Sequence, residues 1–286
     1  MAIRILTDSA SDISQEKAKE WGITVLPLKV SFGEEEYLDG VTLSPREFYE
    51  KLIETDEFPK TSQITPFTYA EEFRKAVKAG DEVLCFCLSS CVSGSYQSAC
   101  IAAEEFPQSV SVIDTRQFCA SEYIIVFRAV QMRDERRTAK EIDAAIREEL
   151  KDAHVIAVFN TLEYLKKGGR ISSAAALAGN MLSIKPVLTI ENGIVEILGK
   201  ARGSKKSNNM LTEFVKKKGP IDFDRPVCLA YSGFSNEELY KYVEDSRDLY
   251  AGNELRMQET IAGATIGTYA GPGAIAVAFF TKTDRE

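Results

Sequence analysis

The residues best suited to chemistry lie in the stretch LSSCVSGSYQSA, residues 88–99, which places five serines around one glycine. The stretch follows the apolar run EVLCFCL, which is typical of a buried strand, and leads into a helix predicted to begin at about Ser95. Backbone N–H groups at a helix start attract anions, and Ser93 and Ser95 add hydroxyl donors. Serine at the start of a helix also commonly serves only as its N-cap. The pattern therefore favours two interpretations, an anion-binding loop or a helix cap.

A serine nucleophile is a sharper alternative for the same stretch. The sequence VSGSYQ is not the G-x-S-x-G turn of the α/β-hydrolases. The only histidine, His154, opens an apolar run where a structural role is expected, and a Ser-His-Asp enzyme would have to recruit it. Neither a P-loop nor a kinase signature is present. An enzyme acting through Ser93 on an acyl or phosphorylated small molecule is kept as the alternative to a binding protein.

Other polar segments are candidates for the same site. The loops TDSAS (7–11) and KTSQIT (60–65) end predicted strands, and ligands tend to bind at the carboxyl ends of parallel strands. Two basic clusters, LKKGGRIS with Arg170 and GKARGSKKS with Arg202, indicate either a positive patch facing an anion or partner, or ordinary solvated charge. The glycines around Tyr269 indicate close backbone approach or a tight connection into the last strand.

The order of predicted elements divides the chain into two α/β domains. Residues 1–152 alternate strands and helices, two of which begin with capping boxes at 44–47 and 138–141, and this alternation predicts a parallel sheet. Residues 153–286 contain two apolar runs joined by Asn192-Gly193, a strong hairpin signal. The second domain is therefore predicted to have a mixed sheet with helices on one side. Its strands include ELRMQET, residues 254–260.

Composition narrows the functional classes. The chain has 286 residues, 44% of them hydrophobic, and a net charge of −8, which argues against nucleic-acid binding. It begins without the apolar core of a signal peptide and has no run of about 18 apolar residues. The six cysteines are therefore expected to be reduced in the cytoplasm. Cys85 and Cys87 have the character of strand residues, so no metal site is expected.

Seven segments together resemble one family. They run nearly end to end, in the family's order: ILTDSASDIS, KTSQITP, LSSCVSGSYQSA, VIDTRQ, TLEYLKKGGRIS, KPVL and GTYAGPGAIAVAF. On these segments the sequence resembles the DegV family of bacterial fatty-acid-binding proteins. The resemblance implies a parallel-sheet α/β/α domain followed by an α/β domain with a mixed sheet that closes an acyl pocket. It also implies a long-chain fatty acid as the ligand, with no other cofactor and no catalytic residue.

The resemblance also assigns residues to the site. The threonine of the T-S-Q motif and the first serine of the S-G-[ST]-Y motif hold the carboxylate in the family, and here they are Thr61 and Ser93. Hydroxyl and backbone donors suit a carboxylate, and a dry tunnel suits its chain. Four further residues would complete or flank the head-group pocket, namely Ser62, Gly94, Ser95 and Tyr269.

Some family members carry the acyl chain for a bacterial fatty acid kinase, whose separate ATP-binding subunit phosphorylates the carboxylate. By this resemblance, Arg170 and Arg202 would face the phosphoryl group or the partner subunit. The family commonly has histidine in G-T-H-x-G-P-G, where this chain has Tyr269. A tyrosine donates a hydrogen bond but carries no positive charge near neutral pH. If that histidine assists phosphoryl transfer in the family, this protein would bind fatty acid yet serve the kinase poorly. The alternative is that Tyr269 supports a different head group.

Overall fold

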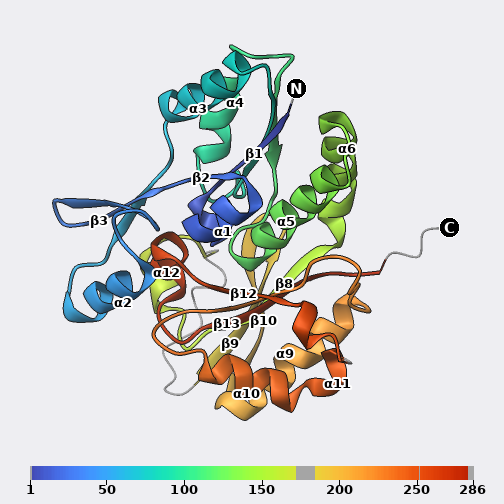
Figure 1. Ribbon diagram of the computed structural model, residues 1–286. Helices are drawn as coiled ribbons and strands as arrows, with labels where there is room; N and C mark the ends of the chain where they lie inside the picture. The colour runs from blue at the N-terminus through green and yellow to red at the C-terminus, as the bar shows by residue number, and fades with distance from the viewer. Residues whose placement is uncertain (1, 172–183, 251, 283–286) are drawn as a thin grey trace.

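The computed structural model describes residues 2–171, 184–250 and 252–282, which contain three β-sheets (Figure 1). The first sheet is parallel throughout, in the order β2-β1-β6-β7. Its strands are β1 (Ile3–Asp8), β2 (Thr24–Leu26), β6 (Glu82–Cys87) and β7 (Val110–Asp114). The helices around it are α1 (Gln15–Trp21), α3 (Pro66–Lys78), α4 (Ser95–Ala103), α5 (Ala120–Asp134) and α6 (Ala139–Glu149).

Alternate strand residues bury both faces of this sheet. Leu84 and Phe86 of β6 pack with α1, α5 and α6 on one face, whereas Val83 and Cys85 pack with α3 and α4 on the other. This alternation places helices on both sides of the sheet, because successive side chains of a strand point to opposite faces. The predicted parallel-sheet α/β/α arrangement is confirmed.

A small antiparallel sheet, in the order β4-β3-β5, lies beside the first one and was not predicted. Its strands are β3 (Lys29–Phe32), β4 (Glu35–Leu38) and β5 (Lys60–Ser62), and α2 (Pro45–Glu54) follows β4. The sequence predicts one extended run from β2 through β3, but the run breaks at Pro27, and the chain leaves the parallel sheet there. Residues 9–11 form the short 3-10 helix η1 (Ser9–Ser11).

The second large sheet is mixed, in the order β10-β9-β8-β13-β11-β12, and lies below the first in Figure 1. Its strands are β8 (Ala153–Val158), β9 (Ile184–Glu191), β10 (Ile194–Arg202), β11 (Cys228–Tyr231), β12 (Gln258–Ile261) and β13 (Ile275–Phe280). Its region also contains α7 (Glu163–Lys167), α9 (Ser204–Lys218), α10 (Glu237–Asp245), α11 (Arg247–Tyr250), α12 (Ala264–Ala270), η2 (Leu150–Asp152) and η3 (Glu254–Arg256). The predicted hairpin is confirmed, with positive φ at Asn192 and Gly193.

The prediction that helices cover only one side of this sheet is wrong. Ile156 and Val277 face α9 and α10, but their neighbours Ala157 and Ala276 share a core cluster with α5. Helix α5 therefore packs on both large sheets. The division into domains at residues 152 and 153 stays a prediction, because this core is continuous across it.

Two segments of the second half differ from their predictions. Residues 254–256 form a 3-10 turn, so the predicted strand is shortened to β12. The glycine-containing segment around Tyr269 is the helix α12 rather than a plain connection. Among the described residues, no helix is long and apolar enough to cross a membrane, and no group of three or more metal-ligating side chains converges.

Candidate functional site

Two adjoining cavities lie between α12, the segment just before α5, and the strands of the second large sheet. The larger one, here called the polar cavity, has a volume of about 380 Å³ and is lined by hydroxyl, amide and guanidinium groups at one end. The smaller one, here called the apolar arm, has a volume of about 70 Å³. Of the residues that the structure describes, five line both cavities, namely Phe118, Phe159, Val195, Ile266 and Ala270. The two cavities are therefore immediate neighbours that share part of their walls.

Thr61 and Tyr269 meet in the wall of the polar cavity. Thr61 lies on β5, where it pairs with Val30 of β3, and Tyr269 lies in the last turn of α12. The Thr61 Oγ1 and Tyr269 Oη atoms are 2.6 Å apart, and either can donate the hydrogen bond. Residues 208 positions apart in the sequence thus form one hydroxyl pair.

Arg170 also lines the polar cavity, beside Tyr269. Its guanidinium carbon lies 5.2 Å from the centroid of the Tyr269 ring, which allows a cation–π contact. The guanidinium donates to the carbonyl oxygens of Gly168 at 2.8 Å and Val92 at 3.4 Å. These contacts hold a positive charge at the wall that also carries the hydroxyl pair.

The serine loop is both a cap and part of the cavity wall. Ser93 lines the polar cavity, and its hydroxyl donates to Ser95 Oγ at 3.1 Å and accepts a hydrogen bond from the Ser95 backbone N–H at 3.2 Å. Ser95 is fully buried, and its Oγ accepts a hydrogen bond from the Ile64 N–H at 3.3 Å. A Cβ atom at Gly94 would collide with the Gln63 amide. The serine loop and the loop after β5 are therefore packed against each other at α4.

The structure brings most of the predicted site residues together. Those that line the polar cavity are Thr61, Ser62, Ser93, Gly94, Arg170 and Tyr269. Ser95 lies behind this wall and supports it. Arg202 ends β10, is exposed, and is not among the described residues that line either cavity. Of the basic motif that contains Arg170, the final residue, Ser172, lies outside the described residues.

The single histidine lies elsewhere. His154 is on β8, its Nε2 is 3.4 Å from Thr281 Oγ1, and its ring packs near Phe279. Burial lowers the pKa of His154 to about 4, so the ring is neutral at neutral pH. The described linings of the two cavities do not include it. His154 and Ser93 therefore do not form the nucleophile–base pair that the hydrolase interpretation requires.

The apolar arm is built on small residues of three neighbouring strands. Ala276 of β13 pairs directly with Ala157 of β8 on one side and with Ala230 of β11 on the other. All three alanines line the arm. Because side chains in register share a face, this row of methyl groups leaves a groove where larger side chains would fill the space.

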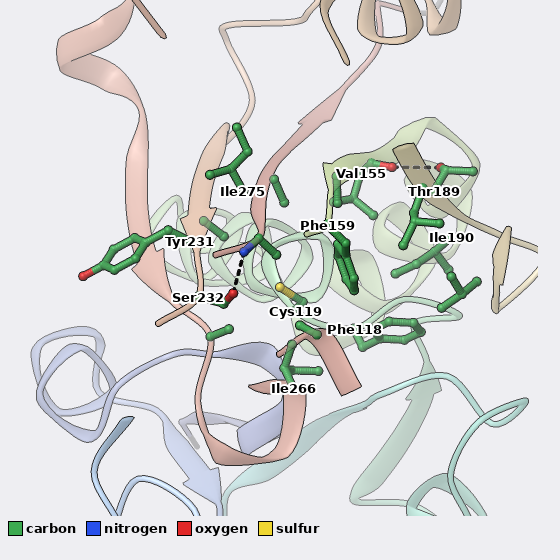
Figure 2. A pocket seen from close by; sticks show the side chains of 18 residues that line it. Phe118, Cys119, Val155, Phe159, Thr189, Ile190, Tyr231, Ser232, Ile266 and Ile275 are labelled. Atoms are coloured by element: carbon green, nitrogen blue, oxygen red, sulfur yellow. Dashed lines mark hydrogen bonds between the residues drawn. The ribbon is translucent and has the colours of Figure 1, made fainter. Parts of the chain in front are cut away.

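The hydroxyl groups of Thr189 and Ser232 in the wall of the arm already have hydrogen-bond partners. Thr189 donates to the Val155 carbonyl at 2.8 Å, and Ser232 donates to the Gly271 carbonyl at 2.6 Å. Ser232 also accepts from the Ala274 N–H at 2.8 Å (Figure 2). The Tyr231 hydroxyl points away from the other labelled side chains (Figure 2). The arm therefore offers an apolar surface to an occupant.

Sequence reasoning missed several residues of the site. Gln63 follows Thr61 and Ser62 in the T-S-Q motif and lines the polar cavity, so its motif was the available signal. Thr265 and Phe118 also line it, without a comparable local signal. For the apolar arm, the available signal was the segment AIAVA, residues 274–278, in which alanine alternates with larger apolar residues. This alternation is typical of a strand that has alanine on one face.

Among the described residues, four buried carboxyl groups of the first half of the chain have raised pKa values. Burial raises the pKa of Asp8 to about 7, and it also raises the pKa values of Asp12, Asp39 and Glu122. Asp8 accepts backbone hydrogen bonds from Leu88 and Ala10, at 2.8 and 3.0 Å. These hydrogen bonds oppose part of the effect of burial. The carboxyl of Asp8 thus fixes the start of the loop that carries the site serines.

A polar cavity with hydroxyl and guanidinium donors beside an apolar arm has the geometry to accept an amphipathic, anionic ligand. The family model described as "Uncharacterised protein, DegV family" matches residues 2–282. A DegV domain-containing protein of Caldanaerobacter subterraneus is 36% identical over 284 residues, covering 98% of this chain and 99% of that protein. The chain therefore belongs to the DegV family.

Solved structures agree with this assignment. A DegV family protein from Thermus thermophilus, described as binding fatty acid, has a TM-score of 0.88 and 32% identity, covering 99% of this chain and 100% of that one. A stearic-acid-binding protein from Eubacterium ventriosum has a TM-score of 0.86 and 28% identity, covering 99% of each chain. The predicted DegV fold is confirmed by these matches.

Proposed function

We propose that this protein binds one long-chain fatty acid, with its carboxylate among the polar groups of the polar cavity and its chain running from that cavity into the apolar arm. The observation that carries the proposal is the junction of the two cavities, which share five lining residues. A ligand that fills both must have a polar head and an apolar tail. Relatives described as binding fatty acid support the same ligand class.

The energetics of the two cavities fit such a ligand. Each methylene that leaves water for the apolar walls of the two cavities contributes about 0.8 kcal/mol. Hydrogen bonds to a charged carboxylate contribute about 1.5–3 kcal/mol each. Of the hydroxyl pair Thr61 and Tyr269, only one donates within the pair, so the other has its proton available for the ligand. Arg170 adds a positive charge to the same wall.

Native and denaturing mass spectrometry of the purified protein tests the ligand directly. We expect a native mass excess that disappears on denaturation, with a fatty acid in the organic extract. A protein that stays at its apo mass after incubation with acids of about 14–18 carbons would contradict the proposal.

Substitution of the head-group residues is expected to weaken carboxylate binding. We expect Ser93→Ala and Thr61→Val each to weaken binding of hexadecanoic acid by roughly tenfold or more, because each removes a hydrogen bond to a charged group. Isothermal titration calorimetry gives the affinities. Ser90→Ala is the matched control, because Ser90 lies in the same loop but binds Asp114 through its hydroxyl.

The same variant distinguishes the enzyme alternative. A binding protein retains weakened binding in Ser93→Ala and shows no turnover in either form. Turnover of an acyl ester or acyl phosphate by the unsubstituted protein that disappears in Ser93→Ala would favour the serine-dependent enzyme.

The finer part of the proposal is that the protein presents the bound carboxylate to the ATP-binding subunit of a fatty acid kinase in the cytoplasm. Arg170 supports this part, because it is exposed and also lines the polar cavity. Arg202 is exposed and lies away from the cavity, so it would act only by contacting the partner subunit. The six free cysteines support a reducing compartment. Mixing the loaded protein with such a subunit and ATP should convert the acid into acyl phosphate.

A further inference from the structure

The helix α12 carries a large share of the cavity wall but has no side-chain cap of its own. Thr265, Ile266, Tyr269 and Ala270 of this seven-residue helix all line the polar cavity. Its N-cap residue, Gly263, has no side chain with which to accept a hydrogen bond. Because the first N–H groups of a helix need partners, the acceptors must come from elsewhere in the chain.

Two buried carboxyl groups supply those acceptors. Asp39, which is 2% exposed, accepts from the Ala264 N–H through Oδ1 at 2.8 Å and from the Thr265 N–H through Oδ2 at 3.1 Å. Asp12 accepts from the Gly263 N–H at 2.8 Å. Each partner of α12 is more than 200 residues away in the sequence.

Glycine at position 263 allows the two carboxyl groups to converge. A Cβ atom there would lie 2.9 Å from Asp39 Oδ1 and 3.5 Å from Asp12 Oδ1. The φ of Gly263 is −71°, which any residue adopts. Close approach of the carboxyl groups, rather than backbone conformation, is therefore what requires glycine at this position.

The small antiparallel sheet holds α12 at both ends. Asp39 directly follows β4, and its own N–H donates to the Leu28 carbonyl at 3.0 Å. Thr61 lies on β5 and bonds Tyr269 in the last turn of α12. Both β4 and β5 pair with β3. The position of the Tyr269 hydroxyl relative to Thr61 thus depends on where Asp39 places the first turn of the helix.

We infer that Asp39 is a positioning residue of the head-group site, which acts through the first turn of α12 to set where Tyr269 presents its hydroxyl to the ligand carboxylate. The inference rests on the proposed function, since it needs a carboxylate at Thr61 and Tyr269. Without the two bonds from Asp39, the helix start shifts, and Tyr269 loses its alignment with the carboxylate. The apolar contacts of the tail in the arm do not depend on that alignment.

The test compares hexadecanoic acid with hexadecan-1-ol, which has the same tail and no carboxylate. In the unsubstituted protein we expect the acid to bind more tightly than the alcohol. Asp39→Asn and Gly263→Ala are each expected to weaken acid binding by about tenfold, because a charge-assisted hydrogen bond is misaligned. Alcohol binding should stay within about twofold.

A double-mutant cycle distinguishes positioning from a general loss of structure. If Asp39 acts through Tyr269, then Asp39→Asn added to Tyr269→Phe should have little further effect on acid binding. Asp81→Asn is the matched control, because Asp81 is also a mostly buried carboxylate, bonded to the Ala2 N–H and to Arg4. It should lower the melting temperature without changing the ratio of acid to alcohol affinity.

The possible outcomes separate the inference from the function beneath it. If the unsubstituted protein binds neither compound, the proposed function fails. If it prefers the acid and Asp39→Asn keeps that preference, or if the effects of Asp39→Asn and Tyr269→Phe simply add, the positioning role is wrong. Equal losses for acid and alcohol would also overturn it, since they would show a structural role only.

Discussion

Replacing Ala276 with leucine is expected to weaken the binding of hexadecanoic acid by roughly fiftyfold while leaving decanoic acid within about twofold. Ala276 is the central residue of the alanine row, and it lines the apolar arm between Ala157 and Ala230. Leucine adds three carbon atoms to this face, and these occupy the space of about three methylenes of the ligand, each contributing about 0.8 kcal/mol. Titration with a series of saturated acids measures the effect.

The dependence on chain length is what identifies the arm as the site of the tail. Val277→Ala is the matched control, because Val277 lies on the same strand but faces α9 and α10, so the variant loses stability without filling the arm. Equal weakening of decanoic and hexadecanoic acid by Ala276→Leu would contradict the placement of the tail.

The elements that the sequence predicted well are those whose causes lie within a few residues. The Ser44 hydroxyl accepts from the Glu47 N–H, and the Glu47 carboxylate accepts from the Ser44 N–H, so the capping box alone marks the start of α2. Asn192 and Gly193 both adopt positive φ, which is the conformation that a tight hairpin turn needs.

The elements that escaped prediction depend on distant partners. The strand β5 has three residues and exists because Thr61 pairs with Val30 of β3. The helix α12 is short and glycine-rich, and its start is held by Asp39 from 225 residues away. Such segments carry little local preference, so periodicity and capping signals do not reveal them.

In the candidate site, too, local motifs pointed to some residues, whereas others depend on distant parts of the chain. The resemblance pointed to Thr61, Ser93 and Tyr269, and the structure places all three in one cavity, while their roles in binding stay predictions. It also pointed to Arg202, which lies away from that cavity. The structure alone reveals the arm, because the row of alanines forms only when three strands come into register.

The buried carboxyl groups predict how stability changes with pH. Burial raises the pKa of Asp8 to about 7 in the folded protein, against a usual value near 3.8. Between about pH 4 and pH 7 the folded state therefore holds a proton that the unfolded state has released. The contribution of Asp8 to stability is therefore largest below about pH 4 and falls as the pH rises toward 7, by about 4 kcal/mol at about 1.4 kcal/mol per pKa unit.

Burial raises the pKa values of Asp12, Asp39 and Glu122 as well, so the contribution of each of these groups to stability also falls as the pH rises. Urea unfolding at a series of pH values gives the slope, and Asp8→Asn should reduce it by about one proton between pH 4 and 7. The contribution of Asp81 to stability has the opposite pH dependence, because its hydrogen bonds with the Ala2 N–H and Arg4 lower its pKa. Asp81→Asn should therefore keep the slope between pH 4 and 7, and a slope that Asp8→Asn leaves unchanged would show that Asp8 is ionised when buried.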